Sequence, residues 1–543
     1  MFARSKRQWV SPFLWGGLIL LVAQSCSIAG PSEAGLDLLT YNASDGIRSL
    51  DPAKATDLET MWAVDQLYEG LLELDASLQV VPALAEKWSV SADGVRYAFR
   101  LRPVTFHNGE PLRAQDVAAS FSRLLDPNEA LPGRWVLRDL LDEGGVEVIS
   151  SDSLHLNLKR SNPVFASLLA TPQASVLCDG GQKGNPDLED LGTGPFVLKG
   201  WLAETAMVLH AFSDYWMRDS LGEQLPYLDG VRLDFNREEG AEMLGFRQGR
   251  YDFVSAPSAE WMNVFFSENG TWNPEWKGRF RKFTTPYLKT DYIGILMDST
   301  ALIEQGFTVL PAEVRLALSL SLDRDQLVRE LRAGGAAPAV GFVPPGMPGF
   351  SAGLRPALSC VQYDLDSART LLAQLGIGPE HRLGGLTLGT KPATADLAAA
   401  LQHTWSGLGI DVDIDVAPSA LDAERVAKSQ VALFRKSWLA DYPDAENFLG
   451  LFDAARWAPN GPNYTHYSDE QVDEWLMSLS GIRAPTQRQA LLRKIESRVM
   501  QTTPLIPLWH DEVFHLVSSS LSGWEVSATN RLELRRVRRS GQP

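Results

Sequence analysis

The chain has 543 residues, of which 45% are hydrophobic, and it carries a formal net charge of −17 at pH 7. This length and apolar content are sufficient for a large core and for more than one domain. The acidic balance argues against nucleic-acid binding, which requires a basic surface. Composition therefore predicts a large globular protein whose partners are not nucleic acids.

The N-terminus has the features of an export signal. The first seven residues include three basic ones, and residues 13–23 form an apolar run that is short for a membrane span. We interpret residues 1–25 as a signal peptide. Ala23 to Cys26 resembles a bacterial lipobox, although Leu is more usual where Ala23 stands. Cys26 would then carry a lipid anchor; the alternative is a cysteine that falls by chance near an ordinary cleavage site.

Cysteine and histidine usage gives no sign of a metal or cofactor site. Beyond Cys26 only Cys178 and Cys360 remain, and neither has ligand spacing around it. The two could pair in an oxidising compartment, or they could be free buried thiols. The eight histidines are scattered singly, and we expect His107 to be a hydrogen-bonded turn residue. We predict no cofactor and no metal.

The first half of the chain alternates strands, turns and helices. Residues 36–41 are strand-like, and residues 97–102 alternate as a half-buried hairpin strand after a turn at 91–94. Residues 228–235 read as another strand. Two helices are predicted from apolar residues on one face: Met61, Val64, Leu67, Tyr68, Leu71 and Leu72 for the first, and Val117, Phe121 and Leu124 for the second.

The second half contains a clear local fold signal. Residues 386–390 are strand-like, 394–408 helical and 410–416 strictly alternating. Such a strand–helix–strand unit predicts a partly parallel sheet with a right-handed crossover. The polar face of its last strand consists of aspartates, which we interpret as a solvated surface rather than a metal site. Asp364 is a plausible N-cap of an earlier helix.

Six spaced motifs between Leu50 and Ser120 follow one order: LDP, Q-x-YEGL, P-x-LA-x-x-W, S-x-DG-x-x-Y-x-F-x-LR, FH-x-G-x-P and A-x-DV-x-x-S. Residues 437–449 match the pattern GW-x-x-DYPDP-x-NFL, with Ser437 in place of the usual Gly and Ala445 in place of the second Pro. Together they resemble the family 5 extracellular solute-binding proteins, the peptide-binding components of ABC importers.

The resemblance covers nearly all of the chain after the signal and implies its architecture. It implies an α/β, two-lobed periplasmic-binding-protein fold (type II, cluster C-like) with mixed sheets, a hinge and an extra domain. The expected segments are 1–25 as signal peptide, 27–60, 191–292 and 504–543 as parts of lobe I, 61–190 as the extra domain, and 293–503 as lobe II.

The resemblance also implies a ligand site around residues 435–442. The family's aspartate at the position of Asp441 commonly binds the ammonium group of the ligand. By itself, an aspartate before a turn often only bonds its own backbone. The other candidates are the backbone groups of Ser437 and Leu439, Trp438 and Tyr442 as pocket walls, and Arg435 as a carboxylate partner; Trp438 could equally be a core residue.

The implied function is a substrate-binding lipoprotein that captures short peptides and delivers them to an ABC permease and ATPase. We expect an exported, lipid-anchored monomer in the cell envelope and no enzymatic activity, since SxxK and HExxH are absent. Two alternatives remain open within binding: a non-peptide solute such as a nickel complex, haem, opine, sugar or antibiotic, and a peptide sensor without transport. An exported hydrolase is the alternative from another class.

Overall fold

The computed structural model describes residues 35–141, 144–181, 191–267, 270–332, 335–353 and 358–540. The chain divides into two compact units, Met1–Leu36 and Asp37–Pro543, and the second is described below. The predicted signal peptide and Cys26 lie outside the described residues. Among those described, no helix is both long and apolar enough to cross a bilayer.

The first lobe is built on a mixed sheet with strand order β1-β10-β9-β8. The predicted first strand is present as β1, which pairs in parallel with β10, Leu38 lying opposite Gly230. The strand predicted at 228–235 is β10. The elements around this sheet are β1 (Leu38–Asn42), α1 (Leu58–Leu67), β8 (Phe196–Leu202), β9 (Ala206–Ala211), β10 (Gly230–Asp234), α5 (Glu239–Arg247), β11 (Phe253–Ser255) and α6 (Ala259–Phe265).

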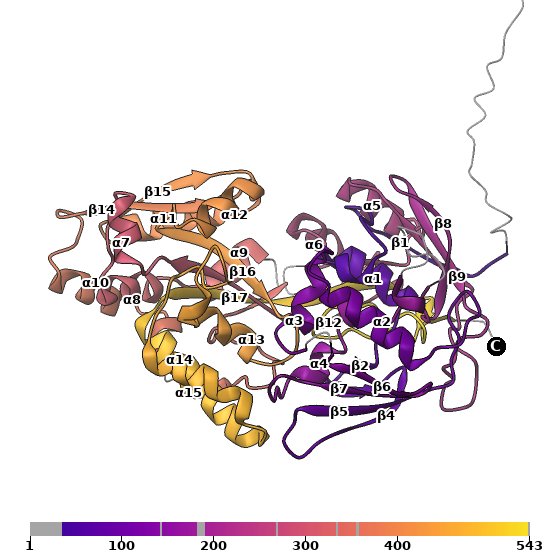
Figure 1. The fold of residues 1–543 in the computed structure, drawn as a ribbon. Coiled ribbons are helices and arrows are strands. Elements are labelled where there is room, and N and C mark those ends of the chain that lie inside the picture. The colour runs from indigo at the N-terminus through magenta and orange to yellow at the C-terminus, as the bar shows by residue number, and fades with distance from the viewer. Residues whose placement is uncertain are drawn as a thin grey trace, which may run out of the picture. The chain divides into compact units, whose positions relative to one another are not determined.

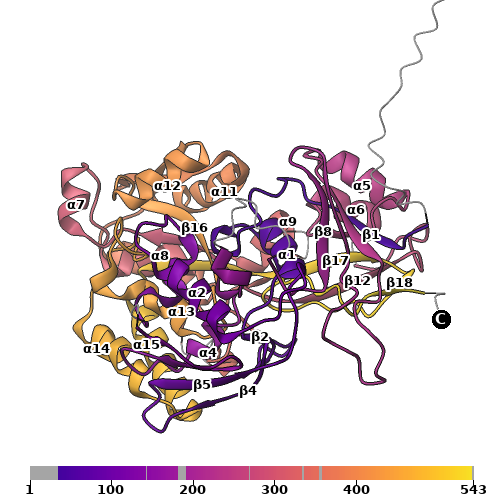
Figure 2. The same cartoon turned by 45° about the vertical axis from the view of Figure 1, so that its right-hand side comes forward.

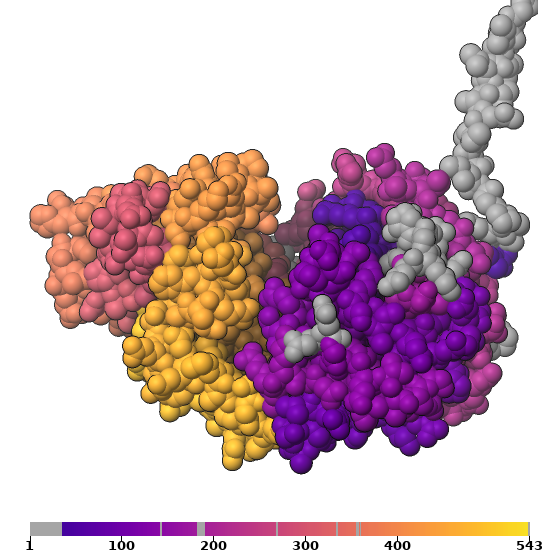
Figure 3. Space-filling view, viewed as in Figure 1, coloured from indigo at the N-terminus to yellow at the C-terminus, as the bar shows by residue number. Residues whose placement is uncertain are grey.

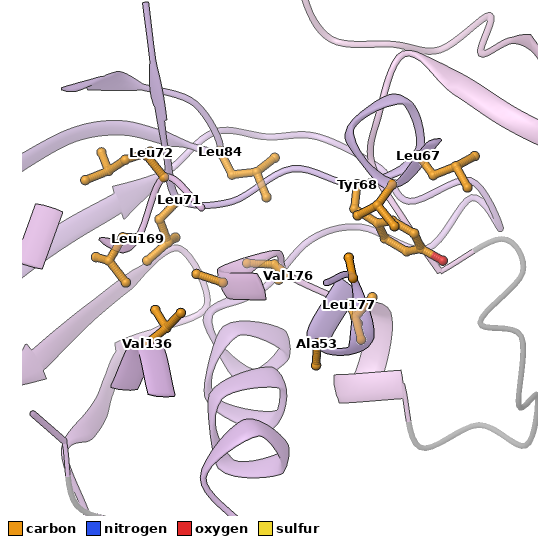
Figure 4. Packing of buried hydrophobic residues seen from close by; sticks show 14 of the residues in the cluster. Ala53, Leu67, Tyr68, Leu71, Leu72, Leu84, Val136, Leu169, Val176 and Leu177 are labelled. Carbon is orange, nitrogen blue, oxygen red and sulfur yellow. The ribbon is translucent and has the colours of Figure 1, made fainter. Parts of the chain in front are cut away.

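Antiparallel hairpins pack beside this sheet, in the order β4-β5-β7-β6. The predicted hairpin strand is β5, paired with β4 from Val90 opposite Tyr97, and the predicted second helix is α2. Figure 4 shows side chains from several of these elements meeting in one apolar core. The elements are β2 (Leu72–Leu74), β3 (Val80–Pro82), β4 (Ala85–Val90), β5 (Arg96–Leu101), α2 (Ala114–Leu125), α3 (Trp135–Arg138), β6 (Val146–Ser150), β7 (Ser153–Asn157) and α4 (Phe165–Leu168).

The first predicted helix is shorter than its apolar pattern suggested. Helix α1 ends at Leu67, and Leu72 begins strand β2. A side chain at Gly70 would lie 2.8 Å from the carbonyl oxygen of Leu169, so the chain passes too close to that backbone for a bulkier residue. Because the helix ends before residue 69, the Glu69 side chain lies in the core, where the Tyr215 hydroxyl donates to its carboxylate at 2.8 Å. Tertiary packing here overrides the helical pattern.

The second lobe is built on a sheet with order β11-β17-β12-β16-β14-β15, and β13 pairs with β17. The predicted strand–helix–strand unit is present: β14 and β15 pair in parallel and α11 connects them. Asp364 caps α10 by accepting the Ser367 N–H at 2.9 Å, as predicted. The elements of this lobe are α7 (Ser299–Glu304), α8 (Ala312–Leu320), α9 (Arg324–Arg332), β13 (Ala336–Pro338), α10 (Leu365–Gln374), β14 (Leu383–Thr390), α11 (Ala395–Ser406), β15 (Ile410–Val416), α12 (Ser419–Ala427), β16 (Leu433–Leu439), α13 (Glu446–Leu449), α14 (Glu470–Ser478) and α15 (Pro485–Thr502).

Two long antiparallel strands, β12 (Phe280–Ile295) and β17 (Leu505–Ser518), belong to both lobes. Strand β17 pairs with β11 of the first lobe near its C-terminal end and with β13 near its middle. The pairing of β12 with β17 is irregular between Pro286 and Thr290. Figures 1 and 2 show the two strands passing from one set of elements to the other. The domain boundaries expected from the sequence stay a prediction.

The buried guanidinium of Arg324 offers a test of how the second lobe is held together. Arg324 donates to the carbonyl oxygens of Pro507 at 2.7 Å and Cys360 at 3.2 Å, and it is 4% exposed. Arg324→Met should lower the free energy of unfolding by about 2–4 kcal/mol, since these acceptors lose their donor. Urea unfolding measures this. Arg329→Met, on the exposed side of the same helix, should change it by less than about 0.5 kcal/mol.

Candidate functional site

One edge of strand β16 lacks a neighbouring strand along most of its length. Antiparallel residue pairs alternate between hydrogen-bonded and non-hydrogen-bonded. The Ala440 N–H donates to the Leu288 oxygen at 2.9 Å, so the backbone groups of Ser437 and Leu439 point away from β12. On that other side β14 pairs with β16 at Leu433 and Phe434. Residues 435–439 therefore present an open edge within the described part of the chain.

Asp441 lies two residues beyond this open edge. Its side chain is exposed to solvent. Protein atoms nevertheless surround it closely enough that loss of hydration raises its pKa, while a hydrogen bond from Asn447 and the charge of Arg456 act in the opposite direction. A carboxylate that is accessible but partly desolvated is stabilised in its charged form by a nearby cation. It can still be reached by a cation, and such a cation would relieve the cost of its partial desolvation.

Asn447 holds Asp441 and Trp438 in place. Its side-chain nitrogen donates to Asp441 Oδ2 at 3.1 Å, and its oxygen accepts from Trp438 Nε1 at 2.8 Å and from the Asp441 N–H at 3.3 Å. Trp438 also packs against the apolar cluster of the second lobe. Asn447 itself is 8% exposed, so this bridge is part of the core rather than of the surface.

The other predicted residues lie along the same segment with different surroundings. Leu439 is 42% exposed and Ser437 is half-buried, and both are on the open edge. Tyr442 is half-buried and packs against the apolar cluster of the first lobe, and burial raises the pKa of its phenol. Asp444, after the turn, accepts the Glu446 N–H at 2.8 Å at the start of the one-turn helix α13.

Arg435 forms an ion pair inside the protein, with Asp291 of strand β12. Asp291 is fully buried and also lies 3.4 Å from the ammonium group of Lys289. Asp511 of β17 joins this cluster through Lys289 and through Arg332, the latter at 2.8 Å. Burial lowers the pKa of Arg435, although a guanidinium stays protonated at any physiological pH. The cluster ties β16, β12, β17 and α9 together.

Sequence reasoning missed Asn447, Lys289, Asp291 and Asp511. Asn447 lies in the quoted 437–449 motif but received no role there. Lys289 and Asp291 alternate within an otherwise largely apolar strand, and charges at alternate positions of such a strand are a usable signal. No local pattern shows that Asp511 reaches them, because it comes from a strand more than 200 residues later.

No group of three potential metal-binding side chains of His, Cys, Asp or Glu occurs in the described ranges. On the aspartate face of β15, Asp411 pairs with Arg382 and Asp415 with Arg425. Cys178 and Cys360 are both buried and no disulfide joins them, so the structure favours buried thiols over the pairing left open by the sequence. His107 Nε2 donates a hydrogen bond to the carbonyl oxygen of Gly194 at 3.0 Å, as expected of a turn histidine.

Residues 79–460 match the family model of the bacterial extracellular solute-binding proteins, family 5 Middle. The chain belongs to this family. Its members are solute-binding proteins rather than enzymes, and the family resemblance seen in the sequence motifs is thereby confirmed.

Relatives of known identity match over almost the whole chain. The oligopeptide-binding protein OppA of Bacillus subtilis is 25% identical, with 91% of this chain and 92% of OppA covered. Di/tripeptide-binding protein 2 of Pseudomonas aeruginosa is 26% identical, with 96% and 98% covered. The structure of NikA from Brucella suis in complex with Fe(III)-EDTA superimposes with a TM-score of 0.78 at 19% identity, covering 92% and 99%. The two-lobed α/β fold is confirmed.

The hydrogen bond from Asn447 to the Asp441 carboxylate leads to a prediction for the titration of Asp441. Asn447→Ala removes the hydrogen bond that lowers the pKa of Asp441, so this pKa should rise further above its usual range. Carbon-detected NMR of the aspartate carboxyls across pH measures it. Asn128→Ala, which changes only a turn of the first lobe, should leave Asp441 unaffected. An unchanged titration in the Asn447 variant would show that the bond does not form.

Proposed function

We propose that this protein binds short peptides between its lobes and delivers them to the permease and ATPase of an ABC importer. The observation that carries the proposal is Asp441, an accessible and poorly hydrated carboxylate at the end of an open strand edge. Peptides are the class of solute that offers both complementary features, a terminal ammonium group and a backbone that can add to a strand. The peptide-binding relatives support the same assignment.

The ligand would lie extended along residues 435–439. Its backbone would bond to the outward N–H and C=O groups of Ser437 and Leu439, as an added strand does. Its ammonium group would meet Asp441 in a charge-assisted hydrogen bond. Since backbone groups and one terminus supply the affinity, side chains of the ligand can differ, and water can fill the space around them.

Arg435 stays our candidate partner for a ligand carboxylate. Its pair with Asp291 already offsets its charge, so we expect it to contribute less to affinity than Asp441. Tyr442 would wall the site from the side that contacts the first lobe. Trp438 would act through Asn447, by holding the segment that carries Asp441 in position.

We further propose that the protein is exported and tethered to the cell envelope by lipid on Cys26. The sequence pattern of residues 1–26 supports this. A lipid anchor would keep the protein close to its membrane partners while its lobes remain free to bind solute.

A non-peptide solute is the second candidate function. Two observations favour it: the structure of NikA, which shares this fold, contains Fe(III)-EDTA, and Ser437 stands where relatives usually have glycine. The Ser437 side chain leaves less space for a ligand at the open edge than a glycine would leave. For such a solute, Asp441 would have no ammonium to bind. A peptide sensor without transport would use the same site but lack transporter partners.

Native mass spectrometry of the gently purified protein tests the class of ligand. We expect a series of short peptides that share a free N-terminus, because Asp441 would select the ammonium group. The released ligands can be sequenced directly. A single non-peptide mass would keep the fold and overturn the peptide assignment.

The role of Asp441 is tested with matched ligands. Asp441→Ala should weaken binding of a peptide with a free N-terminus by about 2–5 kcal/mol, because its ammonium group loses its counter-charge. Titration calorimetry with the same peptide in free and N-acetylated form separates this effect from general damage to the site. Asp413→Ala, on an exposed strand face, is the control for net charge. A loss of tenfold or less would make Asp441 a solvated turn residue.

A further inference from the structure

We infer that the two lobes carry a closure latch, formed by Leu78 of the first lobe and Arg483 of the second, which sets ligand affinity without touching the ligand. The inference concerns lobe closure, and its consequence for affinity rests on the proposed binding function. Both residues lie outside the 435–442 segment, and neither belongs to the motifs that identify the family.

Leu78 projects from the tip of the β2–β3 hairpin. It is 8% exposed although Ser77 and Gln79 on either side are exposed, so it is buried against something other than its own hairpin. It belongs to the apolar cluster of the second lobe, which α13 and α15 help to build and which also includes Ala528. One apolar side chain of the first lobe thus belongs to the cluster of buried side chains that lies mainly in the other lobe.

The backbone of Leu78 is in the left-handed region, with φ of 62°. Leucine rarely adopts this conformation, and Asn or Gly would fit it with less strain. Asp75 stabilises the turn by accepting the N–H groups of Ser77 and Gln79 at 2.8 and 2.9 Å. A strained leucine at a turn that would suit asparagine better indicates that its side chain is needed for contact.

Arg483 makes the second half of the latch. It precedes helix α15 and donates to the Ala92 carbonyl oxygen at 2.6 Å, in the turn between β4 and β5. Gly94 in the same turn has φ of 74°, and a side chain there would overlap the Arg483 guanidinium, 1.4 Å away. The turn therefore offers both the acceptor and the open space that this arginine occupies.

The two contacts lie along one boundary. In Figure 3 the yellow surface of the C-terminal helices meets the purple surface of the hairpin region. The latch consists of one leucine and one arginine, which is small enough to open and close about the β12–β17 strands.

Such a latch changes affinity through the closed population. A ligand that binds between closed lobes has an apparent Kd equal to its intrinsic Kd divided by the fraction of closed protein. Weakening the latch should therefore raise the Kd of every ligand by the same factor. The change should appear mainly in the dissociation rate, because opening precedes release. A residue that touches the ligand would instead affect different ligands differently.

The test uses Leu78→Asn, which keeps the turn but removes the apolar anchor, and Arg483→Ala. Arg493→Ala, an exposed residue on α15, is the matched control. Spin labels at Lys87→Cys and Met477→Cys, both exposed, report the distance between lobes by double electron–electron resonance. The native Cys178 and Cys360 are buried. Trialanine and trilysine are the probes for affinity.

Without ligand, each latch variant should shift the distance between the two spin labels toward that of the open form. Each variant should also raise the Kd values of trialanine and trilysine by the same factor of about 3–10. Loss of the buried Leu78 side chain should also lower the unfolding temperature of that variant, whereas Arg483→Ala, at an exposed residue, should leave it unchanged. Distances equal to those of the control variant would overturn the latch. Unequal factors for the two peptides would show that the residues act on the ligand. If neither peptide binds the unmodified protein, the peptide proposal fails with these probes, and the ligand-free distances still decide the latch.

Discussion

The pairing of β12 with β17 is the constraint on which the rest of the structure depends. These strands cross between the lobes, so any movement of one lobe against the other must be absorbed within them. Their register is irregular between Pro286 and Thr290, next to the point where Leu288 bonds both Ala440 and Ala528. A bulge bends and twists a strand locally. The segment that carries Asp441 is therefore attached beside the part of the ladder that is easiest to deform.

The ion cluster around Asp291 gives this crossing its rigidity on the second-lobe side. A fully buried carboxylate is costly to desolvate and is tolerated only with partners, here Lys289 and Arg435. Removing one cation would leave an unpaired buried charge. The cluster fixes β16 against β12, and the open edge of β16 thereby keeps a defined position. The orientation of the site therefore depends on an ion pair between Arg435 and the buried Asp291.

Much of the fold could be predicted because its signals are local. The alternation in residues 410–416 and the apolar helix before it are sufficient for a parallel pair, and the turn at 91–94 defines a hairpin. The length of α1 could not be predicted, because the end of this helix depends on Gly70 passing the carbonyl of Leu169, about 100 residues away. For the site, the motif located Asp441 but not Asn447 as its support. The ion-pair partner of Arg435 could not be predicted either, because Asp291 is brought to Arg435 by the pairing of β12 with β16.

The open edge of β16 has a consequence for the empty protein. A row of unpaired N–H and C=O groups is a template for any extended chain, including a strand from a second molecule. Lys436 places a positive charge on this strand, a common protection against unwanted strand pairing. A ligand bound along the edge would cover these groups. Solute binding would then protect the protein from self-association, and the ligand-free protein would be the form more prone to it.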